Sequence, residues 1–313
     1  MSAQRTPLDG GRWHWQHGPI DIVVQAEGEG LVLAGAHEQA WQRFRGILDE
    51  LVGELRLLRQ PVDDACGLQG PVARRMWNAC ADARGACASP PFITPMAAVA
   101  GSVAQELIAF YQRPGIARAW INNGGDIALH LAPGQSARVG VFSDLARFDP
   151  LRDTGPLDTD GQFEIRAKTP VRGIATSGWR GRSFSLGIAD SVTVLAATAA
   201  QADAAATLIA NAVDVQDPGI RRLPASQCKD DSDLGDIPVT VDVAALAPMQ
   251  VQHALAAGVL RAQALQRAGL VWSAALACQG QWRVVQPLCS RALDTEEDCA
   301  RSLAGDAVGS VFA

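Results

Sequence analysis

Gly173-Ile174-Ala175-Thr176-Ser177-Gly178 is the most informative stretch of the chain, because an apolar strand pattern ends there in two hydroxyl groups and a glycine. Ile121-Asn122-Asn123-Gly124-Gly125-Asp126-Ile127 precedes it, and Gln201-Ala202-Asp203-Ala204-Ala205-Ala206-Thr207 follows after a second apolar segment. Packing alone does not require three small, polar, loop-forming elements in this order. They are therefore candidates for a ligand site held between strands and a helix.

The segment Asn122–Asp126 lies between two predicted strands, residues 118–122 and 126–131. Asn-Gly is typical of a tight turn there, since both residue types tolerate positive φ. A plain hairpin explains the asparagine and Gly124, but it requires neither Gly125 nor the carboxylate of Asp126. The alternative is a site in which Asn123 and the glycines border a nucleotide, while Asp126 accepts hydrogen bonds from ribityl or ribose hydroxyls or from a purine amine.

Thr176, Ser177 and Gly178 end the next strand. Hydroxyl groups and a glycine in this place commonly present hydrogen-bond donors to phosphate oxygens. Serine and glycine also end many strands that bind nothing. The local sequence leaves both interpretations open.

Asp203 and Thr207 are four residues apart in a predicted helix and therefore share one face. A carboxylate and a hydroxyl group suit a hard cation, and Mg²⁺ favours a sparse oxygen site that waters and substrate phosphates complete. The alternative is a capping or surface pair in an alanine-rich helix.

Thr94-Pro95 opens a predicted helix over residues 96–111, with threonine as N-cap and proline at the first helical position. The first half of this helix has almost no side-chain bulk, because residues 97, 98, 100, 101, 102 and 104 are alanine, glycine or serine. Close packing of the helix backbone explains such residues. A helix N-terminus that faces a phosphate explains them as well.

The rest of the pattern mixes hairpins with helices. Residues 17–26 and 30–35 read as two strands around the turn Glu27–Gly30, and residues 40–58 repeat apolar side chains at helical spacing. The other predicted elements are helices over residues 71–84, 199–213 and 249–268 and strands over residues 138–142, 163–168, 171–175, 191–196, 239–243 and 270–276. This predicts an α+β protein, a single domain in which helices pack largely on one side of a mixed or antiparallel sheet. We expect the domain to span residues 12–290 and residues 291–313 to be a mobile C-terminal tail.

Composition limits the function classes. The 313 residues are 48% hydrophobic with a net charge of −6, which predicts a globular protein. Dispersed basic residues argue against nucleic acid, and alanine-rich helices broken by polar residues argue against a membrane span. Seven cysteines without a C-x-x-C pair, and an N-terminus without a signal-peptide pattern, predict a cytoplasmic protein. The sequence leaves a homodimer open.

The ordered motifs resemble those of the ApbE family, the flavin transferases that take FMN from FAD. That family carries, in order, an Asn-x-Gly-Gly-Asp turn, an Ala-Thr-Ser-Gly strand end, a Ser-Val-Thr-Val strand and a helix that starts Ala-x-Ala-Asp, with a hydroxyl group four residues after the aspartate. The corresponding segments here are Asn122–Asp126, Ala175–Gly178, Ser191–Val194 and Ala200–Thr207. The similarity is strongest over residues 90–215.

The resemblance implies an ApbE-like, T-fold-like domain and a small nucleotide-type ligand, FAD or FMN. By the same resemblance, Asp203 and Thr207 would hold Mg²⁺ that bridges the FAD pyrophosphate. Gly124, Gly125 and Asp126 would border the flavin nucleotide.

The chain departs from the family pattern in one segment. Flavin transferases carry a sequence resembling His-Ile-Ile-Asp-Pro before the Ser-Val-Thr-Val strand, whereas residues 179–190 contain neither that histidine nor that proline. With Thr94–Gly101 and a Trp-Arg-Gly-Arg-Ser loop, the chain looks more like a cytoplasmic, uncharacterised branch of ApbE-like proteins.

The sequence does not single out a catalytic residue, and four candidates remain. Ser177 ends the hydroxyl-rich strand. Arg180 and Arg182, two apart in a glycine-rich loop, are suited to clamp a phosphate or carboxylate, although a solvated loop explains them equally well. His130 is four residues after Asp126 in an alternating strand and shares its face, although a packed or solvated histidine is the ordinary interpretation.

Three hypotheses follow, and they leave open whether the chain is an enzyme. The first is an ApbE-like protein that binds a flavin nucleotide with Mg²⁺ and cleaves or transfers at the pyrophosphate. The second is a non-catalytic flavin- or pterin-binding protein of cofactor biosynthesis or one-carbon metabolism. The third is a hydrolase of an unrelated small molecule that uses the same pocket.

Overall fold

The computed structural model describes residues 2–63, 65–141, 161–181, 183–230 and 232–288. Its centre is an antiparallel sheet of nine strands in the order β1-β2-β3-β4-β5-β8-β9-β12-β13. These strands are β1 (Gln4–Leu8), β2 (Arg12–His17), β3 (Ile20–Gly28), β4 (Ile116–Asn123), β5 (Asp126–Leu131), β8 (Gly173–Ser177), β9 (Ser191–Ala196), β12 (Ser273–Cys278) and β13 (Gln281–Val285).

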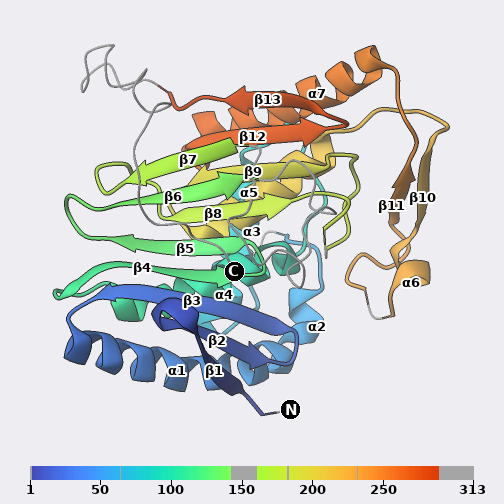
Figure 1. Ribbon diagram of the computed structural model, residues 1–313. Coiled ribbons are helices and arrows are strands. Elements are labelled where there is room, and N and C mark those ends of the chain that lie inside the picture. The colour runs from blue at the N-terminus through green and yellow to red at the C-terminus, as the bar shows by residue number, and fades with distance from the viewer. Residues whose placement is uncertain (1, 64, 142–160, 182, 231, 289–313) are drawn as a thin grey trace.

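Helices cover one face of this sheet (Figure 1). They are α1 (Gly30–Gly53), α2 (Leu55–Leu58), α3 (Pro71–Gly85), α4 (Val99–Ile108), α5 (Ala199–Ala212) and α7 (Pro248–Arg267), with 3-10 turns η1 (Asp9–Gly11), η2 (Pro95–Ala98) and η3 (Ala109–Tyr111). Among the described residues, α5 lies most centrally, and its buried alanines let its backbone lie close to β8 and β9. None of the helices in these described ranges is long and apolar enough to cross a membrane.

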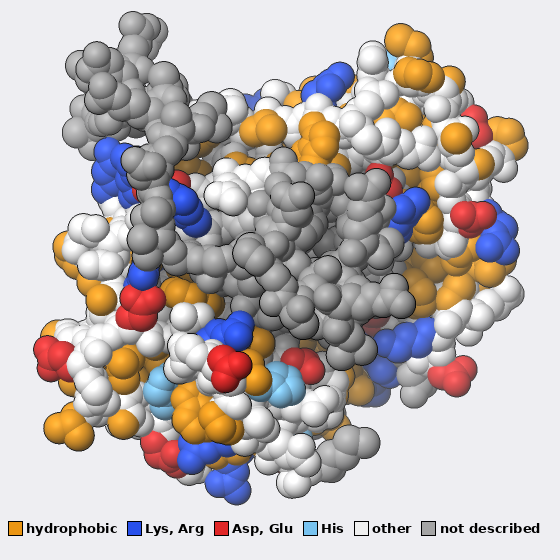
Figure 2. Space-filling view, in the orientation of Figure 1, with side chains coloured by type: hydrophobic (Ala, Val, Ile, Leu, Met, Phe, Trp, Pro, Cys, Tyr) orange, Lys and Arg blue, Asp and Glu red, His pale blue; other side chains and the backbone are white. Residues whose placement is uncertain are grey.

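A separate hairpin of β6 (Ser136–Val141) and β7 (Gly161–Arg166) packs on the other face. Its Val139 and Ile165 meet Trp120 of β4, whereas the next residue, Ile121, belongs to the core under the helices. Successive strand residues point to opposite faces, so the middle of the sheet is buried on both sides. Basic and acidic side chains are interspersed on the surface in view in Figure 2.

A two-stranded arm of β10 (Ile220–Pro224) and β11 (Pro238–Val243), with α6 (Ala225–Cys228) between them, stands beside the main sheet at the right of Figure 1. Thr240 N–H donates to the carbonyl of Ser185 at 2.9 Å, and Arg222 pairs with Asp214. These bonds attach the base of the arm to the loop before β9 and to the chain after α5.

The predicted fold class is confirmed: the chain is a single α+β domain. Residues 126–131 and 191–196 form β5 and β9 as predicted, and the helices predicted over residues 71–84, 199–213 and 249–268 are α3, α5 and α7. The sheet begins before the predicted domain start at residue 12, since β1 precedes it. The predicted tail, residues 291–313, lies outside the described residues.

The strand predicted over residues 30–35 is wrong, because α1 begins at Gly30. Leu31 and its neighbours look like a strand, but the buried positions of α1 recur every three or four residues, and Leu31 itself is 93% exposed. The preceding hairpin turns instead at Gly18, whose φ is 57°.

The helix predicted over residues 96–111 begins as the 3-10 turn η2 and becomes α-helical at Val99. Thr94 occupies the N-cap position without capping the helix through its side chain. Its hydroxyl donates instead to a carboxylate oxygen of Asp233, near the tip of the arm.

Gly101 is where α4 and α5 come closest. A Cβ atom added to it would lie 2.3 Å from the carbonyl oxygen of Ala199 and 2.9 Å from Cβ of Asp203. We expect Gly101→Ala to lower the free energy of unfolding by about 2 kcal/mol or more, although alanine favours helices over glycine by about 1 kcal/mol. Urea denaturation measures the change.

Gly35→Ala in α1 is the matched control, because a Cβ atom there has no neighbour within 4 Å. It should be neutral or stabilise the protein by about 0.5–1 kcal/mol. Equal effects of the two substitutions would contradict the close α4–α5 contact.

Candidate functional site

The turn between β4 and β5 has a tightly specified backbone. Gly124 and Gly125 have φ values of 66° and 108°, and the side-chain oxygen of Asn122 accepts from Gly125 N–H at 2.8 Å. Positive φ values make glycine the favoured residue at both positions. Turn conformation therefore accounts for the second glycine, which a plain Asn-Gly hairpin had not explained.

Asn123 connects this turn to the first residues of α4. Its side chain is 6% exposed, and its Nδ2 donates to the carbonyl of Ala100 at 3.1 Å. Residues directly opposite in an antiparallel pair share a face, so Asp126, which pairs with Asn123, also points to the helix side. The turn thus presents an amide and a carboxylate toward the start of α4.

Asp203 approaches the same point from α5. One of its carboxylate oxygens accepts from Gly101 N–H at 2.9 Å. Burial raises the pKa of Asp203 to about 7, although the backbone N–H groups of Gly101 and Ala100 oppose that rise. Asp203 is therefore a helix-capping carboxylate between two packed helices rather than half of an exposed surface pair.

Thr207 lies one turn further along α5 and is partly buried. No group of three or more His, Cys, Asp or Glu side chains suited to a metal ion occurs within the described ranges. The metal role of Asp203 and Thr207 stays a prediction.

Asp126 joins the turn to the end of β8. β5 and β8 form only two residue pairs, Ile127 with Ile174 and Ala128 with Gly173. Beyond them, a carboxylate oxygen of Asp126 accepts from Thr176 N–H at 3.2 Å. The carboxylate thus bridges two strands where their backbone pairing has stopped.

Thr176 and Gly178 are held mainly by neighbouring strands and loops. The hydroxyl groups of Thr176 and Thr193 are 3.0 Å apart. A Cβ atom on Gly178 would lie 2.3 Å from the carbonyl oxygen of Asp190, so the glycine is required for close backbone approach. Ser177, between them, is partly buried on the helix side of the sheet, since it pairs with the core residue Val192.

The structure therefore brings together most of the residues predicted to bind a cofactor. The turn of β4 and β5, the end of β8 and the first turns of α4 and α5 meet through three hydrogen bonds. These bonds join Asn123 to Ala100, Asp203 to Gly101 and Asp126 to Thr176.

Arg180 belongs to a loop that folds back on itself. Its guanidinium group lies 4.9 Å from the ring centroid of Trp179 and 3.8 Å from a carboxylate oxygen of Asp190. Asp190 also accepts from the indole N–H of Trp179 at 3.3 Å and from Gln279 N–H. Arg180 is thus held beside the end of β8, while Arg182 lies outside the described residues.

His130 is not brought to this site. It shares a face of β5 with Asp126 as predicted, but four residues of strand separate them by about 13 Å. Its Nε2 lies 3.2 Å from the carbonyl oxygen of Ile116, and burial lowers the pKa of His130. It is a packed histidine at the opposite end of the strand.

Two residues important to this region escaped the sequence analysis. Asp190 organises the loop after β8, and Asp233 binds Thr94 near the start of α4. Asp190 directly precedes the predicted strand at Ser191, so its place at a strand end was a usable signal. Asp233 lies in an aspartate-rich loop whose folding toward Thr94 no local pattern indicates.

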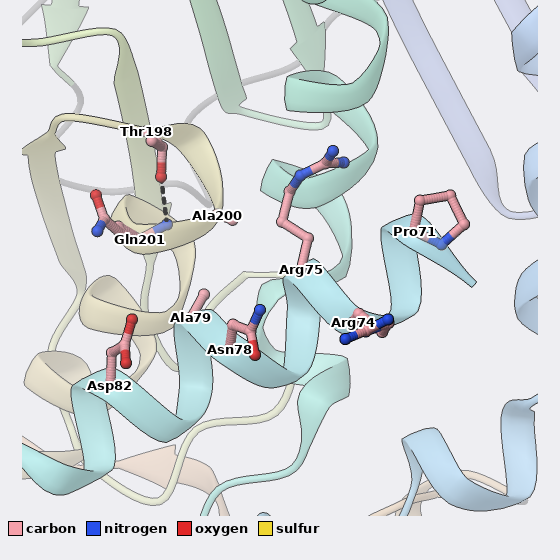
Figure 3. Close-up of a pocket in the computed structure, with 9 residues that line it drawn as sticks. All are labelled: Pro71, Arg74, Arg75, Asn78, Ala79, Asp82, Thr198, Ala200 and Gln201. Atoms are coloured by element: carbon pink, nitrogen blue, oxygen red, sulfur yellow. Dashed lines mark hydrogen bonds between the residues drawn. The ribbon is translucent and has the colours of Figure 1, made fainter. Parts of the chain in front are cut away.

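A cavity of 460 Å³ lies nearby, between α3 and the first turn of α5 (Figure 3). Its lining residues are Pro71, Arg74, Arg75, Asn78, Ala79, Asp82, Thr198, Ala200 and Gln201. Arg75 is engaged with Glu106 at 2.8 Å, and Thr198 caps α5 by accepting from Gln201 N–H. None of the predicted site residues lines this cavity.

These features define a single-domain α+β protein with a polar region at the meeting point of two helix starts and two strand ends. The chain belongs to the family described as AbpE bacteria, whose model matches residues 4–284.

Curated relatives match a shorter part of the chain than the family model does. A UPF0280 protein of Methanospirillum hungatei is 37% identical over 126 residues, which are 40% of this chain and 47% of the relative. A UPF0280 protein of Methanopyrus kandleri is 40% identical over 133 residues, 42% of this chain and 48% of the relative. The chain thus spans about half the length of the curated relatives it matches.

Among solved structures, the chain is similar to the apo form of the flavinyl transferase ApbE of Pseudomonas stutzeri. The identity is 12%, the TM-score is 0.43, and 98% of this chain and 97% of that chain are covered. The flavin transferase ApbE of Vibrio cholerae gives 12% identity and a TM-score of 0.41, with 90% and 97% covered.

The pKa of Asp203 predicts a pH-dependent stability. The pKa of Asp203 is about 7 in the folded protein, above the ordinary value of 3.8. At a pH between 3.8 and about 7, Asp203 is therefore protonated in the folded protein and ionised in the unfolded chain. The contribution of Asp203 to stability is therefore complete below pH 3.8 and is lost as the pH rises through about 7.

Asp203→Asn should remove this dependence, since asparagine still accepts from Gly101 N–H but does not ionise. We expect the stability of the parent protein relative to the variant, measured as the difference in free energy of unfolding, to fall by about 2–3 kcal/mol between about pH 5 and about pH 7.5. Urea denaturation at several pH values measures this difference. Parallel pH profiles would show that Asp203 ionises normally in the fold.

Proposed function

We propose that this chain binds a flavin nucleotide, FAD or FMN, together with Mg²⁺, and acts on its pyrophosphate. The observation that carries the proposal is that Asn123 and Asp203 both bind the first turn of α4, while Asp126 links the same β4–β5 turn to Thr176 at the end of β8. Three motifs that are far apart in the sequence are thus joined by hydrogen bonds. Membership of the AbpE bacteria family supports the same ligand class.

The residues present fit a magnesium ion. Asp203 and Thr207 offer a carboxylate and a hydroxyl oxygen from successive turns of one helix, and magnesium accepts such a sparse set when waters and phosphates complete it. Bound Mg²⁺ would neutralise charge on the pyrophosphate. Because Asp203 has a pKa near 7, we expect metal affinity to rise with pH through that value.

The other residues would orient the nucleotide. Asp126 would accept hydrogen bonds from hydroxyl groups of the ligand, and the positive-φ backbone of Gly124 and Gly125 would allow close approach. Arg180 would meet a phosphate or carboxylate from the loop after β8, where Asp190 and Trp179 limit its motion. The dispersed basic residues of the sequence and its net charge of −6 support a small molecule rather than nucleic acid as the partner.

A binding protein without transfer activity is the second candidate, and the position of His130 favours it. General-base catalysis needs a titratable group within hydrogen-bond reach of the reacting atom. His130 is at the opposite end of β5, and the family's His-Ile-Ile-Asp-Pro-like segment is replaced here by residues 179–190.

Flavin binding is tested by calorimetry with FAD and FMN, with Mg²⁺ and with EDTA. We expect micromolar affinity that depends on Mg²⁺, and a loss of about tenfold or more for Asp126→Ala, the scale of a charge-assisted hydrogen bond. Asp203→Ala should abolish the effect of Mg²⁺ while thermal unfolding stays cooperative. No heat with either nucleotide would refute the flavin assignment, and affinity unchanged by both EDTA and Asp203→Ala would refute the metal site.

Reaction products separate the enzyme from the binding protein. We expect slow Mg²⁺-dependent cleavage of FAD to FMN and AMP but no detectable transfer of FMN to a threonine- or serine-containing acceptor peptide. Cleavage needs a positioned pyrophosphate and water, whereas transfer also needs a base and an ordered acceptor. Chromatography and mass spectrometry follow both products, with Asp203→Ala as the inactive control. Efficient flavinylation of the peptide would contradict this expectation, and intact FAD after long incubation would favour the binding protein.

A further inference from the structure

A second cavity, of 380 Å³, lies between the β1–β2 hairpin and the first turns of α1. It is lined by Arg5, Trp13, Gly30, Leu33, Ala34, His37 and Glu38. It shares no lining residue with the candidate flavin site. Trp13 of β2 pairs with Val24 of β3, which pairs with Ile121 of β4, so two strand spacings, about 10 Å, separate Trp13 from the strand that ends at Asn123.

The walls of this cavity are flat and largely apolar. Trp13 contributes an indole ring, and Leu33 and Ala34 contribute aliphatic groups from α1. The guanidinium group of Arg5 lies 5.6 Å from the ring centroid of Trp13 and 5.3 Å from that of Trp41. Aromatic rings and a planar guanidinium group favour a planar occupant, which stacks on their faces.

His37 supplies a directional polar group. Its Nδ1 lies 2.8 Å from the hydroxyl oxygen of the buried Tyr111, which fixes the ring, and its Nε2 has no hydrogen-bond partner within the described ranges. Burial and the charge of Arg5 lower the pKa of His37, so the imidazole is neutral at pH 7. A half-buried ring nitrogen in an apolar cavity gains free energy from a ligand that hydrogen-bonds to it.

The charges at the rim cancel. Arg5 forms an ion pair with Glu38 at 2.8 Å, and Glu38 also accepts from Gln42 at 2.7 Å. The lining residues therefore carry one positive and one negative charge, with neutral His37. This balance offers an anion or a cation no net attraction.

We propose that this cavity is a binding site for a small, uncharged, planar heteroaromatic molecule, which stacks against Trp13 and hydrogen-bonds to Nε2 of His37. The site is independent of the proposed flavin site. Its volume accommodates one or two fused rings, and the ring plane lies between the hairpin and α1.

Benzimidazole is the probe, since it is planar, uncharged at pH 7.5 or above and carries both a ring donor and a ring acceptor. Ligand-observed saturation-transfer NMR on the full chain should detect it with a Kd of about a millimolar or tighter, as expected for a fragment of this size. Benzoate, planar but anionic, and cyclohexanol, uncharged but not planar, should bind at least about fivefold more weakly. In amide spectra of the protein, benzimidazole should shift Gly30 and Ala34 and leave Gly125 unchanged.

Variants locate the binding. Ala34→Phe fills the cavity from an exposed helix position and should abolish binding of benzimidazole, while Trp13→Leu should weaken it about fivefold or more. His37→Phe keeps a flat ring but removes the nitrogen and should weaken binding by a similar factor. Leu31→Ala, one position outside the cavity, is the matched control and should bind like the parent protein; thermal unfolding verifies that each variant is folded.

Three results would overturn the proposal. One is the absence of saturation transfer to benzimidazole. Another is affinity unchanged in folded Ala34→Phe. The third is benzoate binding as tightly as benzimidazole, which would show that the site selects charge rather than a neutral ring. None of these results depends on whether FAD binds at the candidate flavin site.

Discussion

The contact between the starts of α4 and α5 is the constraint on which the rest of the candidate site depends. Gly101 lets the two helix backbones approach, and its N–H group then donates to the carboxylate of Asp203. A larger residue at 101 would separate the helices, and the carboxylate would lose the N–H groups that stabilise it against burial. The close packing of α4 on α5 and the hydrogen bond to Asp203 therefore depend on the same small residue.

The sheet forms the other half of the candidate site where the backbone pairing of β5 with β8 ends. β5 and β8 share only two residue pairs, and the side chain of Asp126 replaces the next backbone contact by accepting from Thr176 N–H. The polar side chains at this end of β5 and β8 therefore take the place of backbone pairing, and Asn123 connects the same turn to α4.

The local sequence pattern was sufficient to predict those helices and strands that keep a single hydrophobic periodicity along their whole length. β5, β9 and α5 could be predicted because alternation or an alanine-rich helical repeat marks them throughout. The helical state of Gly30–Gly35 could not be predicted, because the buried residues of α1 begin only at Ala36 and the first turn has no helical pattern of its own. The proximity of the site motifs was indicated by their order, but the bond from Asp233 to Thr94 joins residues far apart in the chain and has no local signal.

Residues 183–190, which precede β9, are fixed by hydrogen bonds to the end of α5. Asn211, near the end of α5, accepts from both the hydroxyl of Ser185 and the N–H of Leu186, and Ile188 N–H donates to the carbonyl of Val213. The same helix that offers Asp203 near its start therefore fixes this loop at its end. The polar groups of residues 183–190 thus stabilise the fold, and Arg180, which lies 3.8 Å from a carboxylate oxygen of Asp190, is held beside the end of β8. Because these bonds hold residues 183–190 within the fold of the protein alone, their arrangement depends on neither a ligand nor a reaction, so ligand binding and catalysis are separate questions for this chain.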